Sequence, residues 1–149
     1  MFQIKLSEEI NVPKDIVWGV ISNTDDYPIW NKFVVECDST FKVGSPIKMK
    51  VKVFPFMAMP QKETILKNKE YEFLEYGIKM PLGILTSSRQ HILTSSGSET
   101  TKYESVFILK GLLAPLVGFL LGSQLNRGFS DMTSGVAARS LEVYANKND

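Results

Sequence analysis

Residues Gly111 to Glu142 read GLLAPLVGFLLGSQLNRGFSDMTSGVAARSLE, and this stretch decides the fold. Pro115 lies near its start, where the first turn of a helix accepts proline because the missing N–H would have no partner there. No proline follows, so one long C-terminal helix is predicted, from Pro115 to Ala145. Side chains that share one face of this helix recur at helical spacing: Gly118, Leu121, Leu125, Phe129, Met132, Val136 and Val143. We expect this face to pack against an apolar surface.

Glycines lie on or beside the same face, at positions Gly118, Gly122, Gly128 and Gly135. In a helix interior each one costs about 1 kcal/mol relative to alanine. Two interpretations remain open. The missing side chains leave space in front of the helix, as a ligand cavity needs, or they allow tight packing of the helix against a sheet.

The residues before this helix alternate between apolar and polar side chains, as strands do. After Pro46 every second residue up to Val53 is apolar and the residues between them are lysines, so this strand has one dry and one wet face. Strands are predicted for 2–10, 33–38, 46–53, 61–67, 70–77, 85–95 and 100–109, with short helical segments near 15–21 and 25–31. Short connections favour antiparallel pairing. The predicted fold class is α+β: a curved antiparallel sheet of about seven strands wrapped around the C-terminal helix, in a single domain over residues 1–149.

Composition excludes several classes of function. The 17 basic and 16 acidic residues leave a net charge of +1 without a dense basic block, so nucleic acid is not an expected partner. Cys37 and His91 are the only cysteine and the only histidine, which excludes an intramolecular disulfide and the usual zinc site; we expect no metal and no cofactor. The longest apolar run, Gly111 to Gly122, is too short to span a bilayer. The lone cysteine, and first residues that do not resemble a secretion signal, lead us to expect the cytoplasm.

Three parts of the chain resemble a known family. They are VPKDIVW at 12–18 with YPIWNKF at 27–33, RQHIL at 89–93, and GLLAPL at 111–116 continuing through Arg127, Gly128, Phe129 and Met132. Together they are similar to the START/Bet v1-like superfamily and, within it, to bacterial polyketide cyclase/dehydrase-like proteins, also called SRPBCC-domain proteins. The resemblance implies a helix-grip fold, in which the long helix closes a sheet-lined cavity that holds an apolar small molecule.

The chain departs from the family pattern around this cavity. Phe107 stands where similar proteins often carry a glutamate on the last strand. Thr133, Gly135 and Val136 stand where asparagine, alanine and leucine are usual. The resemblance therefore implies a pocket that has been reshaped and made more apolar.

Three side chains are candidates for chemistry. Arg89 and His91 share one face of a predicted strand, where the imidazole can transfer a proton and the guanidinium can hold a carboxylate or polarise a carbonyl. Tyr103, on the next strand, can donate one hydrogen bond to a ligand oxygen. The alternatives are a structural or solvent-facing His91, and a core Tyr103 whose hydroxyl reaches solvent.

The expected ligand site is mostly apolar. Its expected lining is Trp30, Met49, Val51, Phe73, His91, Tyr103, Phe107, Leu121, Leu125, Phe129 and Met132. The segment Phe54 to Pro60 is predicted to be a loop, whose bulky side chains form the cavity mouth: Phe54, Phe56, Met57 and Met59. Alternatively, this loop folds onto the core of its own domain. The start of the long helix is apolar nearly all round, so loops bury it, a second subunit covers it or it touches a lipid surface.

Three hypotheses for function follow. The first is binding or transport of a hydrophobic small molecule such as a lipid, an isoprenoid or an aromatic polyketide. The second is an enzyme of the polyketide cyclase/aromatase type, in which Arg89, His91 and Tyr103 orient a poly-ketone chain for proton transfer and loss of water. The third is an interaction module that uses the apolar loop and the helix start against another protein or a membrane.

Overall fold

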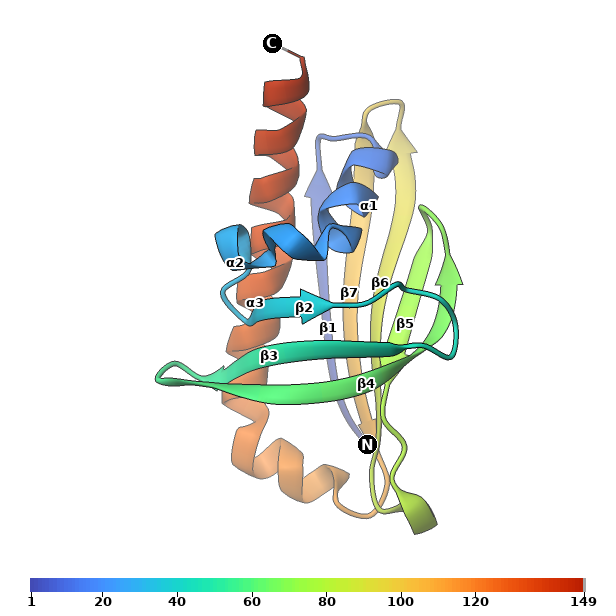
Figure 1. Ribbon diagram of the computed structural model, residues 1–149, viewed down its shortest axis with the longest axis vertical. Coiled ribbons are helices and arrows are strands. Elements are labelled where there is room, and N and C mark those ends of the chain that lie inside the picture. Colours follow the sequence, from blue (N-terminus) through green and yellow to red (C-terminus); the bar gives the residue numbers. More distant parts are fainter. Residues whose placement is uncertain (149) are drawn as a thin grey trace.

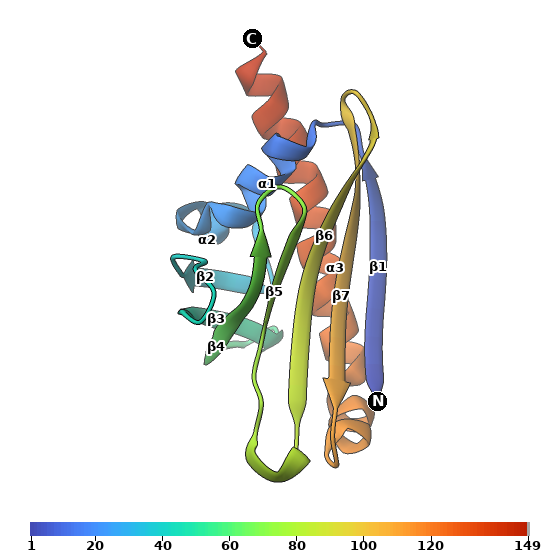
Figure 2. The same ribbon diagram turned by 90° about the vertical axis from the view of Figure 1, so that its right-hand side faces the viewer.

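The computed structural model describes residues 1–148 and has the predicted α+β architecture (Figure 1). One antiparallel sheet contains the seven strands in the order β1-β7-β6-β5-β4-β3-β2, and it curls around the C-terminal helix (Figure 2). The elements in chain order are β1 (Phe2–Ile10), α1 (Lys14–Ser22), η1 (Thr24–Asp26), α2 (Tyr27–Trp30), β2 (Val34–Asp38), β3 (Pro46–Phe54), β4 (Met57–Lys69), β5 (Phe73–Gly77), η2 (Pro81–Gly83), β6 (Thr86–Gly97), β7 (Thr100–Lys110) and α3 (Ala114–Lys147).

The strands follow the alternation of the sequence. In β3, Ile47 and Met49 are buried, whereas Lys48 and Lys50 are exposed. In β6, Arg89, His91 and Leu93 all lie on the buried face, as their spacing predicts. This face of the curled sheet is the one that packs against α3 and surrounds the site.

Helix α3 has Pro115 in its first turn and runs to Lys147, which confirms the predicted C-terminal helix. The middle of its apolar face is buried: Leu125, Phe129, Met132 and Val136. Toward its start α3 becomes more exposed, and Leu121 is only half-buried. Figure 1 shows these first turns running at an angle to the rest of the helix, below the sheet.

The helix glycines pack closely against aromatic side chains. A Cβ at Gly118 would lie 2.7 Å from the ring of Phe2, and one at Gly128 would lie 2.3 Å from the ring of Phe33. A Cβ at Gly135 would lie 3.0 Å from Trp30. Of the two interpretations of these glycines, the structure therefore supports tight packing, and it places aromatic rings where a cavity was the other expectation.

The segment Phe54 to Pro60 is not the predicted loop. β3 continues to Phe54 and β4 begins at Met57, so the two strands form one hairpin with its turn at 55–56. Pro60 is tolerated in β4 because β5 pairs with β4 only from Thr64 onward, so β4 has a single neighbour at this point. The hairpin end is exposed, with Phe56 at 81% of its full accessibility, so it does not fold onto the core.

The close-packed core lies in the half of the molecule that carries α1 and α2. Fully buried side chains there include Val17, Ile21, Tyr103 and Val136, from α1, β7 and α3. Trp18 is also buried in this core. The opposite half of the sheet and the start of α3 enclose the candidate site. Among residues 1–148, no helix combines the length and the apolarity needed to cross a membrane.

Candidate functional site

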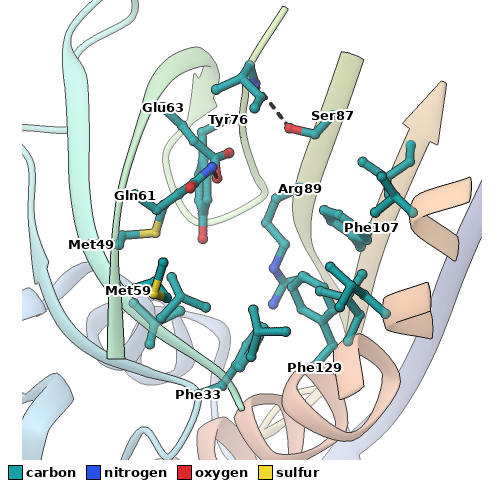
Figure 3. A pocket seen from close by; sticks show the side chains of 18 of the residues that line it. Phe33, Met49, Met59, Gln61, Glu63, Tyr76, Ser87, Arg89, Phe107 and Phe129 are labelled. Atoms are coloured by element: carbon teal, nitrogen blue, oxygen red, sulfur yellow. Dashed lines mark hydrogen bonds between the residues drawn. The ribbon is translucent and has the colours of Figure 1, made fainter. Parts of the chain in front are cut away.

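A cavity of about 200 Å³ lies between α3 and the inner face of the sheet (Figure 3). Its wall is mostly aliphatic and aromatic. The apolar lining residues are Phe33, Val34, Met49, Val51, Val53, Met59, Ile78, Leu85, Phe107, Leu109, Val117, Leu121, Leu125 and Phe129. The polar ones are Gln61, Glu63, Tyr76, Ser87 and Arg89. The cavity thus offers a largely dry interior with a small polar cluster.

Arg89 is the one cation of this wall, and it is only 3% exposed. Its Nη1 donates to Ser105 Oγ at 2.7 Å and to the carbonyl oxygen of Val106 at 3.4 Å. Its Nη2 lies 3.6 Å from the sulfur of Met132, and its guanidinium carbon lies 4.8 Å from the centre of the Phe129 ring. Its Nε is buried and has no hydrogen-bond partner among residues 1–148. No ion pair among residues 1–148 includes Arg89.

Glu63 stands on the facing wall with Gln61, both from β4 (Figure 3). Burial raises the pKa of the Glu63 carboxyl, while a hydrogen bond from Gln61 and the charge of Arg89 act in the opposite direction. Glu63 does not form an ion pair with Arg89 within 4.0 Å. Arg89 and Glu63 therefore lie on opposite sides of the cavity (Figure 3).

His91 lies behind the wall, in a chain of hydrogen bonds with two tyrosines. Its Nδ1 is 2.6 Å from the Tyr103 hydroxyl, and its Nε2 is 3.3 Å from the Tyr76 hydroxyl. Burial, followed by the nearby charge of Arg89, lowers the pKa of His91 well below its usual value. The neutral ring carries one N–H, so it donates to one tyrosine and accepts from the other. Only Tyr76 of these three residues lines the cavity.

Six of the residues expected to line the ligand site border the cavity: Met49, Val51, Phe107, Leu121, Leu125 and Phe129. Met59, expected at the cavity mouth, and Arg89, a candidate for chemistry, border it too. Phe107 stacks on Phe129 with ring centres 4.6 Å apart, so the position where a glutamate was the family expectation forms an aromatic wall.

Other predicted residues lie elsewhere, which corrects their expected place in the wall. His91, Tyr103 and Met132 are fully buried behind it, Met132 next to Arg89. Trp30 packs on Gly135 and on the ring of Tyr27. Phe73 is half-buried on β5 and, like Phe54, Phe56 and Met57 of the hairpin, is not among the lining residues.

Sequence reasoning missed several lining residues on β4 and β5. Gln61 and Glu63 occupy alternate positions that lead to the buried Ile65, so the period of a strand places all three on the inner face. Phe33, expected at the start of a strand and within the segment 27–33 of the resemblance, contacts both α3 and the cavity. Tyr76 carried no separate signal in the sequence.

Exposed apolar side chains lie on three segments that also contribute lining residues to the cavity, namely Met59, Leu85 and Val117. We call this set the rim: Phe56, Met57 and Met59 of the β3–β4 hairpin, Met80 and Leu82 at η2, and Leu112, Leu116, Phe119 and Leu120 at the start of α3. Backbone bonds from Leu112 N to Gly83 O (3.1 Å) and from Leu113 N to Ile84 O (3.0 Å) join the last two groups. Arg127 Nη2 of α3 donates to Val53 O at 2.9 Å and joins α3 to the hairpin.

No protein-family model matches the chain, and no curated protein matches its sequence. Solved structures do resemble it. A START superfamily protein from Mycobacterium smegmatis is 13% identical with a TM-score of 0.72, over 95% of this chain and 98% of the other. An aromatase/cyclase from a Streptomyces species is 12% identical with a TM-score of 0.74, over 93% of each chain. Norcoclaurine synthase from Thalictrum flavum, in complex with dopamine and hydroxybenzaldehyde, is 15% identical with a TM-score of 0.69, over 95% of this chain and 87% of that one.

These likenesses extend over nearly the whole chain and agree with the curled seven-stranded sheet and its long terminal helix. At such low identity they establish the architecture and leave the chemistry to the residues of the site. The chain has a helix-grip fold, and its architecture resembles that of these START superfamily, aromatase/cyclase and norcoclaurine synthase structures.

Proposed function

We propose that this protein binds or transports a small hydrophobic molecule in the cavity between α3 and the sheet. The observation that carries the proposal is a wall of valine, leucine, methionine and phenylalanine side chains around unfilled space, next to a core that is otherwise closely packed. An apolar cavity with a few convergent polar groups is the usual form of a small-molecule site. Burial of the ligand contributes roughly 25 cal/mol per Å² of apolar surface.

The first test is native mass spectrometry of the protein purified from cells, followed by solvent extraction. A stoichiometric lipid or aromatic compound would support the proposal and name the chemical class. Binding of a hydrophobic fluorescent dye tests the place. Leu121→Trp fills the cavity and should weaken dye binding, whereas Leu141→Trp, on an exposed part of α3 away from the lining, should not. Equal dye binding by both variants would contradict the proposed site.

A second candidate is an enzyme of the polyketide cyclase/aromatase type, and the position of Arg89 favours it. The guanidinium borders the cavity and can polarise a carbonyl, while Tyr76 presents to the same cavity a phenol that is hydrogen-bonded to His91. Any proton would reach His91 through Tyr76, because the imidazole itself lies behind the wall. His91→Ala should then abolish turnover of a poly-ketone substrate and leave its binding intact. Unchanged turnover would exclude this role.

The third hypothesis, an interaction surface, is supported by the rim. We propose that the ligand enters between the hairpin and the start of α3, and that the rim meets an anionic lipid surface when it does. The segments that carry the rim, 48–62, 76–88 and 106–127, contain lysines and arginines and no aspartate or glutamate. Apolar side chains surrounded by basic ones suit the boundary between lipid headgroups and acyl chains.

A further inference from the structure

We propose that the ligand is a hydrophobic monocarboxylate whose carboxylate binds the free edge of the Arg89 guanidinium. This inference rests on the proposed function, because it names the chemical class of the molecule in the same cavity. Two observations support it: Arg89 is a buried cation without a carboxylate partner among residues 1–148, and its side chain extends to the centre of the cavity (Figure 3), with Nε lacking a hydrogen-bond partner.

The buried charge of Arg89 favours an anionic ligand. Arginine stays protonated at any physiological pH, and a buried charge is costly unless it is paired and hydrogen-bonded. Arg89 receives only partial compensation: the Ser105 hydroxyl and the carbonyl oxygens of Val106 and of Gln90 (3.2 Å) at Nη1, a thioether near Nη2 and the face of Phe129. None of these carries a negative charge. An anion entering the cavity would therefore gain more at Arg89 than a neutral molecule of the same shape.

The unused donors of Arg89 lie on one edge of its guanidinium. The protein's hydrogen bonds are concentrated on Nη1, whereas Nε has no partner and Nη2 meets only the weak acceptor sulfur of Met132. Nε and Nη2 form one edge of the planar guanidinium, with two parallel N–H directions. This edge matches the two oxygens of a carboxylate, which is the bidentate arrangement typical of arginine. A single carbonyl oxygen would leave one of the two donors unused.

The other titratable groups at or behind the cavity wall are Glu63, Tyr76 and His91. Glu63 faces Arg89 across the open centre, and burial raises the pKa of its carboxyl, which favours the neutral form. Tyr76 is buried with its pKa raised, so its phenol is neutral, and His91 behind it is neutral too. Arg89 is thus the group in this lining that attracts an anion, and the raised pKa of Glu63 lessens the repulsion from the facing carboxyl. A second acidic group on the ligand would find no second cation in the lining.

The size of the cavity limits the rest of the molecule. About 200 Å³ is below the ~300–1,000 Å³ that typical ligand pockets occupy, so the apolar body is compact or extends past Met59 to the rim. We infer a medium-chain aliphatic acid or a small aromatic acid.

The test compares octanoate with 1-octanol, which share a chain and differ in charge, by calorimetry at pH 7.5. Wild-type protein should bind octanoate more tightly than 1-octanol. Arg89→Met, which introduces an unbranched apolar side chain, should weaken octanoate by about 10- to 100-fold and 1-octanol by far less. Arg89→Lys should restore only part of the loss, because a lysine lacks the two parallel donors.

The outcomes separate the two proposals. If 1-octanol binds wild-type protein as tightly as octanoate, the cavity is a ligand site and the carboxylate inference is wrong. If neither binds and the hydrophobic dye also fails to bind, the proposed function fails as well. The comparison of the two probes on wild-type protein needs no variant, so it decides the question even if Arg89→Met does not fold.

Discussion

At the scale of single residues, Gly128 shows why α3 lies so close to the segment before β2. A Cβ at this position would sit 2.3 Å from the ring of Phe33, which itself packs edge-on against Phe129 with ring centres 4.8 Å apart. Neither ring can move without disturbing the cavity wall, since both belong to it. The absence of a side chain at Gly128 therefore allows α3 to contact Phe33, in the segment before β2, at the cavity wall.

We predict that Gly128→Ala lowers the free energy of unfolding by about 1–3 kcal/mol, because overpacking outweighs the gain in helix propensity. The matched control is Gly19→Ala in α1, where no atom lies within 4 Å of the added Cβ. Urea denaturation should show the control at or above wild-type stability. A Gly128→Ala protein as stable as the control would mean that Phe33 has an alternative position.

His91 allows a second prediction at this scale, because it is the only histidine and gives a single imidazole signal in an NMR spectrum. Burial lowers its pKa well below 6.5, so in the folded protein the signal should show no titration midpoint near pH 6.5, whereas in urea it should titrate there. A folded pKa below the unfolded one means that the neutral ring stabilises the fold above pH 6.5, and this contribution is lost as the pH falls below 6.5. A signal that titrates near 6.5 in the folded protein would show that His91 meets solvent.

At the scale of elements, Arg127 connects α3 to the β3–β4 hairpin. Its Nη2 donates to the carbonyl oxygens of Lys52 and Val53, near the end of β3 that has lost regular pairing with β4. The side chain is exposed, so each bond contributes little to global stability. Its effect should be local, on the opening of the hairpin.

We therefore predict that Arg127→Ala raises amide hydrogen exchange at residues 52–59 by several-fold, with a change in unfolding free energy below about 1 kcal/mol. Asn126→Ala is the control, since Asn126 is exposed on the same helix next to Arg127. Unchanged exchange in the hairpin would show that β-pairing alone holds it in place.

The elements were predictable where one local signal dominated. The stretch after Gly111 predicted α3, because it has a proline near its start and apolar residues at helical spacing. Alternation of apolar and polar residues predicted β3, β6 and β7, because every second side chain of a strand lies on its buried face. The strand at 57–60 was not predicted, because Pro55, Pro60 and a run of apolar residues hide the alternation. Pro60 is acceptable there because β4 pairs with only one strand at this point, and the local sequence does not show how strands pair.

The site was less predictable than the fold. Alternation places Arg89 and His91 on the same face, yet only Arg89 reaches the cavity, because His91 lies one step further toward the packed half of the sheet and is enclosed by Tyr76 and Tyr103. Position along a strand decides between core and cavity, and local sequence does not encode it. Glu63 could have been found from alternation on β4.

At the scale of the whole molecule, the two ends differ in character. The end with α1 is closely packed, whereas the opposite end carries η2 and the start of α3, and the β3–β4 hairpin projects to one side (Figure 1). On η2 and the start of α3, Leu82 is 96%, Phe119 86% and Leu112 82% exposed. Exposed apolar side chains of this size mark an interaction surface. Met59 belongs to both the rim and the cavity lining, so a lipid surface that contacts the rim would lie next to the entrance proposed for the ligand.

We predict that the protein associates with liposomes that contain anionic lipids, and more weakly with neutral ones. Phe56→Ser/Met57→Ser and Leu116→Ser/Phe119→Ser should each reduce the bound fraction several-fold in a sedimentation assay, because they remove inserted apolar surface. Leu141→Ser is the control, exposed on α3 outside the rim. Added salt should weaken the preference for anionic lipid and leave the apolar part of the binding. A rim that instead covers a second copy of the chain would give a concentration-dependent dimer in analytical ultracentrifugation, disrupted by the same variants, with no liposome binding, and would overturn the lipid assignment.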